Sequence, residues 1–177
     1  MISERILQYV DAHCHLHDPR IIRDVPGIVQ RAEAAGVTCM VTCATMEENF
    51  EATAALARQY PAVVPCYGIH PWFLDSLSPN WQQALGDRVT AEACGIGETG
   101  LDFMDKNADR DRQMEVFAGH LALARELERP INIHVRKAWD SFVQILKKTG
   151  PLKTPGLVHS FSGSLALGNV LERYDLY

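Results

Sequence analysis

Short apolar runs alternate along the chain with longer segments in which apolar residues recur every three or four positions. The short runs are rich in Val, Ile, Cys and small residues and are apolar on both faces, which is typical of strands in a covered parallel sheet. Six strands are expected on this basis, at Ile6–Asp11, Val37–Cys43, Val63–Gly68, Ala93–Gly97, Ile131–His134 and Gly156–His159.

The longer segments have helical periodicity and recognisable ends. Helices are expected at Pro26–Ala35, from a capping box of Thr45 and Glu48 to about Tyr60, after Ser78-Pro79, at Asp109–Glu128, at Ala138–Lys148 and at Leu165–Tyr174. Regular alternation of strands and helices implies parallel strands joined by right-handed crossovers. Two architectures fit this pattern, an open doubly wound sheet and a (β/α) barrel.

The placement of polar residues favours the barrel. In a barrel, reactive groups gather at the C-terminal ends of many strands around one mouth, whereas an open sheet concentrates them at one switch point. In this chain an ionisable residue follows five of the apolar runs, and these residues are His13 with His15, His70, Glu98, His134 and His159. We therefore expect an α/β fold of the TIM-barrel type.

The stretch "DAHCHLHDP" contains the first candidate metal ligands. Residues two apart on a strand point to the same side, so His13 and His15 project together into the barrel mouth. Imidazoles suit Zn, Mn, Fe or Ni, and a carboxylate such as Glu98 can bridge two cations about 3.5 to 4 Å apart. His134 and His159 would hold the second ion, which predicts a catalytic site with two divalent cations.

Composition narrows the class of protein. The 177 residues are 47% hydrophobic and 22% charged, which predicts one globular domain. The net charge of −5 excludes a strong electrostatic clamp on a nucleic-acid backbone, so contacts with DNA should be local or depend on cations. No apolar run approaches the roughly 18 residues of a membrane span, and the start lacks the basic region of a signal peptide. A cytoplasmic protein without membrane contact is expected.

Several other polar residues have competing interpretations. Asp11 shares a strand face with His13 and is expected either to orient a ligand histidine or to form a hydrogen bond at the strand end. His17 is expected in a loop or in support of the ligands. His120, in the middle of a helix, is expected to be structural. The five cysteines contain no CxxC pair and are expected to be reduced thiols.

The motifs "DAHCHLHDP", "YGIHPW", "GIGETGLDF", "INIHVRKAWD" and "LVHSFSGS" resemble those of the TatD family of metal-dependent deoxyribonucleases, within the amidohydrolase-like barrels. They cover nearly the whole chain in the family's order and spacing. The resemblance implies a hydrolase that cleaves phosphodiester bonds, typically at DNA ends. It also implies that His13 and His15 bind one metal, that Glu98 bridges, and that His134 and His159 bind the other; Zn, Mn, Mg and Ni are the candidate metals.

Two further residues are expected to contact the substrate. The resemblance implies that His70 lies in the mouth against the scissile phosphate. Arg136, just past His134, is expected either to donate to phosphate oxygens or to be a solvated charge at a helix start.

One family feature is missing from the sequence. TatD proteins carry another acidic ligand, in a motif resembling E-T-D at the end of the eighth strand, and it usually serves as general base. This chain stops at "LERYDLY", where Tyr174–Tyr177 is expected to begin a seventh strand. Since a complete barrel has about 250 residues, residues 1–177 are expected to form a single TatD-like barrel domain truncated before the last two βα units. Asp102 and Asp140 are the nearest acidic candidates for the vacant ligand position.

Such an incomplete barrel has consequences for association and for function. Unpaired edges of the first and sixth strands recruit other chains, so self-association is expected. Two alternative functions stay open, another amidohydrolase-like hydrolase and an inactive metal-binding remnant. Many of the former bridge their metals with a carboxylated lysine on the fourth strand, where this chain has Glu98, and the histidinol-phosphatase type also begins with HxH but is not expected to carry the later motifs.

Overall fold

The computed structural model describes residues 8–177, which contain a six-stranded parallel sheet. Its strands are β1 (Tyr9–Cys14), β2 (Val37–Cys43), β3 (Val63–Tyr67), β4 (Gly95–Asp102), β5 (Ile131–Arg136) and β6 (Leu157–Val158). They lie side by side in the order of the sequence, whereas an open doubly wound sheet reverses its order at a switch point. The predicted fold of the TIM-barrel type is confirmed.

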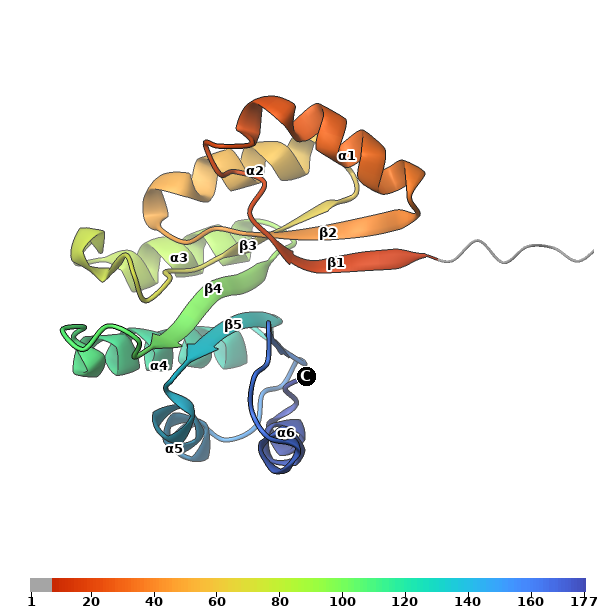
Figure 1. The fold of residues 1–177 in the computed structure, drawn as a ribbon. Helices are drawn as coiled ribbons and strands as arrows, with labels where there is room; N and C mark the ends of the chain where they lie inside the picture. The colour runs from red at the N-terminus through yellow and green to blue at the C-terminus, as the bar shows by residue number, and fades with distance from the viewer. Residues whose placement is uncertain (1–7) are drawn as a thin grey trace, which may run out of the picture.

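A helix follows each strand. These helices are α1 (Val25–Ala34), α2 (Phe50–Gln59), α3 (Trp81–Ala91), α4 (Arg110–Glu126), α5 (Trp139–Thr149) and α6 (Leu165–Leu171). In Figure 1 the sheet curls from β1 and β2 through β4 to β5, with α1 and α2 above the first strands and α5 and α6 below the last. Among residues 8–177, no helix is both long and apolar enough to cross a membrane.

Two clusters of buried apolar side chains fix the helices on the sheet. The larger cluster packs β4 and β5 against α4 and α5, and Phe117, Phe142 and Leu146 are fully buried in it. The smaller one joins β2 to α1 and includes Val29 and Met40. Burial of this kind stabilises a fold by about 25 cal/mol per Å² of apolar surface, so the helices hold the strand ends at fixed positions.

Strand β4 is longer than the apolar pattern predicts, and it places Glu98 inside the strand instead of at its end. Two glycines explain why the pattern misses this extension. Gly97 (φ +128°) and Gly100 (φ +148°) adopt backbone conformations that favour glycine, and an added Cβ would collide with the carbonyl oxygens of Asn132 and His134 on β5. The strands therefore approach closely at and beyond Gly97, where the apolar pattern ends the strand.

The other boundaries differ in smaller ways. β1 runs to Cys14, so His13 lies within the strand, and the expected start at Ile6 lies outside the described residues. The capping box expected from Thr45 and Glu48 is wrong, because the Asn49 side chain accepts from the Thr45 backbone N–H and donates to its hydroxyl instead. A 3₁₀ turn at Glu47–Asn49 precedes α2 and moves the cap by one residue.

The start of α3 and the last residues also differ from expectation. Ser78 does not cap α3, which begins at Trp81, and donates instead to the Glu47 carboxylate. Tyr174 belongs to a 3₁₀ turn, and the expected seventh strand is reduced to a parallel bridge between Leu176 and Gly156. Because Leu176 pairs there, the outer side of β6 is not wholly unpaired, contrary to expectation.

Candidate metal centre

The carboxyl ends of the strands bring five histidines around Glu98, whose side chain is almost completely buried. His13 and His15 come from β1 and the residue after it, His134 from β5, and His70 and His159 from the residues after β3 and β6. Together they border a cavity of about 300 Å³. Segments up to 146 positions apart in the sequence thus meet at one carboxylate.

One oxygen of Glu98 faces the histidine pair of β1. Its Oε2 lies 3.1 Å from His15 Nε2 and 3.4 Å from His13 Nε2, and the two nitrogens are 3.1 Å apart. The opposite nitrogen of each ring has its own partner, because Nδ1 of His15 lies 2.8 Å from the Cys43 carbonyl oxygen and Nδ1 of His13 lies 2.8 Å from Asn132 Oδ1.

These partners fix the tautomers. A carbonyl oxygen only accepts, so Nδ1 of His15 carries the hydrogen. The Asn132 amide donates through Nδ2 to the Ala12 carbonyl oxygen at 2.8 Å, which directs its own oxygen at His13, so His13 Nδ1 also carries a hydrogen. Both Nε2 atoms of the neutral rings then point lone pairs at each other and at Glu98. Three converging acceptor atoms repel one another unless a cation lies among them, so these residues fit a metal ion.

The other oxygen of Glu98 faces the remaining histidines. Oε1 lies 2.8 Å from His159 Nε2 and 3.2 Å from His134 Nδ1. The far nitrogen of His134, Nε2, lies 3.2 Å from Asp102 Oδ2. With its hydrogen on that side, His134 directs a lone pair at the centre, as a metal ligand must.

His70 differs from the other four histidines. Its Nδ1 accepts from the backbone N–H of Trp72 at 3.2 Å, so in the neutral ring the hydrogen lies on Nε2, which is 3.5 Å from Glu98 Oε1. Proximity alone groups His70 with Glu98 and His134 as three possible ligands. The tautomer makes His70 a donor to the centre and not a ligand of it.

The pKa shifts of the centre are those of rings that carry a proton, in place of a cation, on the nitrogen that faces Glu98. Burial would raise the pKa of Glu98, but hydrogen bonds from the surrounding imidazoles hold it well below the usual carboxyl range. Burial likewise would lower the pKa of His15 and His134, yet hydrogen bonding to Glu98 and its charge raise both. For His70 burial prevails and lowers the pKa to about 4. A buried anion is thus surrounded by rings that a cation could satisfy.

A sequence model of the family described as "TatD related DNase" matches residues 10–176. The chain belongs to the TatD family. It is 35% identical over 164 residues to the "uncharacterized metal-dependent hydrolase YjjV" of Escherichia coli, covering 90% of this chain and 62% of that protein. It is 32% identical over 187 residues to human "deoxyribonuclease TATDN3", covering 93% and 65%.

The fold agrees with solved TatD structures. The crystal structure of the TatD homologue YjjV from Escherichia coli superposes with a TM-score of 0.90 at 30% identity, covering 97% of this chain and 67% of that one. The chain spans less than two thirds of the length of the two curated relatives. Family membership and barrel type are therefore established, and both predictions from the motifs are confirmed.

Within this TatD chain, the side chains of two residues with competing interpretations, Asp11 and Arg136, lie away from the ligand rings. Asp11 is exposed, and its Oδ1 accepts from the backbone N–H of His13 at 3.2 Å. This contact is the hydrogen bond at the strand end, the second of the two roles expected for Asp11. Arg136 is half exposed, with Nη1 4.0 Å from Asp102 Oδ2, and it lines a neighbouring cavity.

The remaining histidines and acids can also be placed. His17 lines the 300 Å³ cavity, with its ring centroid 5.7 Å from that of His15. His120 is structural, as predicted, because its Nε2 accepts from the Ile69 backbone N–H and its Nδ1 donates to the Val116 carbonyl oxygen. Asp140 is exposed and lines a different cavity, beside α5.

Sequence reasoning missed Asn132 and the role of Asp102. Asn132 is a buried amide in the apolar run "INIH", two positions before His134 and so on the same strand face. A polar residue at that position of an apolar run could have been recognised in the sequence as a partner of the site. Asp102 is 2% exposed and lies behind His134, on the side away from Glu98, so the structure places it as a support of a histidine.

Proposed function

We propose that this TatD-family chain hydrolyses phosphodiester bonds in DNA with two divalent cations. His13 and His15 would hold one cation together with Glu98, and His134 and His159 would hold the other with the same carboxylate. The observation that supports this most directly is the convergence of the His13 and His15 lone pairs on a buried carboxylate oxygen.

Cations bound there would neutralise charge on a phosphate and lower the pKa of a coordinated water from about 15.7 towards about 7. The chain's own residues supply position and hydrogen bonds. Asn132 and Asp102 hold the rings of His13 and His134 with the lone pairs inward. His70, neutral at pH 7, donates its Nε2–H to a phosphate oxygen, and Arg136 donates from the rim.

DNA is the proposed substrate because a human relative is named a deoxyribonuclease. The chain carries a net charge of −5, so affinity for the phosphate must come from the bound cations and a few local donors. Such a site favours ends and single strands, which can enter a recessed mouth.

The test is metal-dependent cleavage of a single-stranded DNA octamer. The chain reconstituted with Mn²⁺ or Zn²⁺ should release nucleotides, and a chelator should abolish the release. Glu98→Gln should lower metal content and turnover together, because a neutral amide bridges cations poorly. Glu128→Gln makes the same chemical change at an exposed ion pair with Lys153 and should change neither.

Two results would contradict the proposal. Equal metal content in wild type and Glu98→Gln would remove the bridging role. Hydrolysis of amides or lactones without cleavage of any phosphodiester would move the chain to the neighbouring amidohydrolase chemistry.

A further inference from the structure

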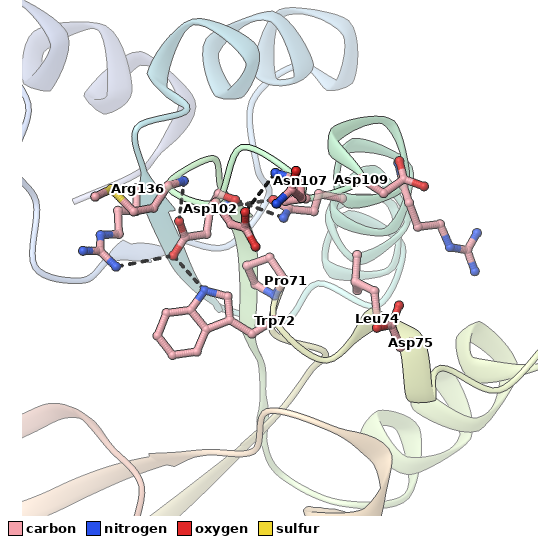
Figure 2. A pocket seen from close by; sticks show the side chains of 13 residues that line it. Pro71, Trp72, Leu74, Asp75, Asp102, Asn107, Asp109 and Arg136 are labelled. Atoms are coloured by element: carbon pink, nitrogen blue, oxygen red, sulfur yellow. Dashed lines mark hydrogen bonds and ion pairs between the residues drawn. The ribbon is translucent and has the colours of Figure 1, made fainter.

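A second cavity, of about 850 Å³, lies beside the metal centre, and the proposed chemistry does not use it. Trp72 borders both cavities. Figure 2 shows the larger one, with Trp72 and Arg136 on the same side as Asp102 and with Leu74, Asp75 and Asp109 across from them. Its volume is in the range of pockets for small organic ligands, about 300 to 1,000 Å³.

Trp72 is exposed and yet held in place. Its side chain is 64% exposed, which is unusual for so large an apolar group. The indole Nε1–H donates to Asp102 Oδ2 at 2.9 Å, and the backbone N–H donates to His70 Nδ1 at 3.2 Å. An aromatic face that is fixed before a ligand arrives loses little conformational entropy on binding.

The position of this face is set relative to the metal centre. The Asp102 oxygen that accepts from Trp72 also faces His134 Nε2, at 3.2 Å. The indole centroid is 4.9 Å from that of His70 and 6.4 Å from that of His134. A group stacked on Trp72 therefore lies next to any phosphate held at the cations.

The charges around the second cavity select against another phosphate. Four carboxylates outnumber two guanidinium groups in its lining, which contains Asp75, Asp102, Asp105, Asp109, Arg112 and Arg136, and Asn107 adds an amide. A phosphate there would be repelled by the carboxylates, whereas an uncharged ring with polar edges would not. The chemistry suits a nucleobase with its sugar.

We propose that Trp72 is the stacking platform for the nucleobase adjacent to the scissile phosphate, with the second cavity as the nucleoside subsite. This proposal rests on the proposed function, because it assumes that the scissile phosphate is bound at the metal centre. Stacking on an aromatic face tolerates every base, so the site would bind a terminal nucleotide with little sequence preference.

The experiment compares two single-stranded DNA octamers with added Mn²⁺, one of normal thymidines and one with abasic residues at both ends. Because Trp72→Ala also removes the indole donor to Asp102, the measurement is the ratio of kcat/KM on the two octamers, and this preference for the normal octamer should fall by roughly 5- to 150-fold. Trp72→Phe, which keeps a ring, should recover most of the loss. Tyr9→Ala removes an exposed aromatic ring (51%) at the start of β1 and should match wild type.

Other outcomes overturn the subsite or separate it from the proposed function. An equal loss of kcat/KM on both octamers would overturn the subsite, because the ring would then act through the metal centre. No loss on either octamer would also overturn it, because the ring would then have no role in cleavage. If wild type cleaves neither octamer, the proposed function fails, and the subsite is judged by equilibrium binding of the two octamers. In that case, the subsite would be overturned if Trp72→Ala bound the normal octamer as tightly as wild type does.

Discussion

At the scale of residues, the centre is organised by partners that lie behind the candidate ligands. A metal-binding imidazole needs its other nitrogen held by an acceptor, and such partners typically affect metal affinity 10- to 100-fold. Here the acceptors are a carbonyl oxygen for His15, an amide oxygen for His13 and a carboxylate for His134. The carboxylate of Asp102 is itself fixed by the Met104 backbone N–H and the Trp72 indole.

Removing the amide partner should weaken metal binding without removing a ligand. Asn132→Ala frees the His13 ring and leaves the Ala12 carbonyl without its donor, so affinity for Mn²⁺ or Zn²⁺ should fall by about 10- to 100-fold. Titration against a competing chelator measures this. Asn132→Asp keeps the acceptor for His13 and should lose less affinity; an affinity unchanged in both variants would contradict the role.

A buried histidine outside the centre gives a pH dependence of stability. Burial lowers the pKa of His120 to about 4, below the value of about 6.5 in an unfolded chain. Since the folded pKa is the lower one, the contribution of this neutral ring is complete above pH 6.5 and is lost as pH falls towards 4, by about 3 kcal/mol.

His120→Gln isolates that contribution, because glutamine offers an acceptor and a donor but does not titrate. Urea unfolding between pH 7 and pH 4 should show a smaller loss of stability in His120→Gln than in wild type. If both proteins lost the same amount of stability between pH 7 and pH 4, the low pKa of His120 in the folded chain would be contradicted.

At the scale of elements, β4 determines how the centre is built. Its eight residues are all buried, and they place Glu98 and Asp102 on either side of His134 from the neighbouring strand β5. Gly100 pairs with His134 in the parallel register. The spacing of these two strands therefore sets the distance from ligand to bridging carboxylate.

A side chain at Gly100 should disturb that spacing. Gly100→Ala adds a Cβ against the His134 carbonyl oxygen at φ +148°, and a loss of about 2 kcal/mol or more in the free energy of unfolding is expected. Gly168→Ala in α6, where an added Cβ meets nothing within 4 Å, should be neutral or stabilise by up to about 1 kcal/mol. Urea unfolding of both variants is the measurement, and equal stabilities would contradict the close approach.

The same elements show what the sequence could and could not predict. Apolar runs and helical periodicity located the six strands and the six α-helices of residues 8–177 but not the short 3₁₀ helices, because burial on both faces leaves a strong signal. The boundary of β4 was wrong because glycines carry no side chain to register in such a pattern. The tautomer of His70 depends on a backbone N–H of Trp72, and the partner of His13 is 119 positions away. Contacts of these kinds follow only from the folded geometry.

At the scale of the whole molecule, the candidate ligands are shared among strands across the entire sheet. No short segment contains more than two of the candidate ligands, His13 and His15, so the centre can assemble only when β1 and β6 are both in place. Ions that bind the folded chain and not the unfolded one stabilise it by mass action. The proposed cations would therefore also stabilise the curl of the sheet.

The outer edge of β1 predicts association of the chain with itself. β1 ends the sheet order among the described residues, and Tyr9 and Val10 are 51% and 61% exposed there. Such an edge recruits other strands, and a lysine on it discourages them. Light scattering over a range of concentrations should show association that Val10→Lys reduces, while a monomer at every concentration in both proteins would contradict it.

The link from Trp72 through Asp102 to His134 also gives the molecule a natural optical probe. Indole emission responds to the electric field and hydrogen bonding at the ring, and this indole donates to a carboxylate that touches a candidate ligand. Trp81 is 7% exposed and packs on His120, so it has different surroundings. The loading of the centre can therefore be followed by fluorescence of the unlabelled chain, with Trp72→Phe, in which Trp81 and Trp139 still emit, as the reference for the signal of Trp72.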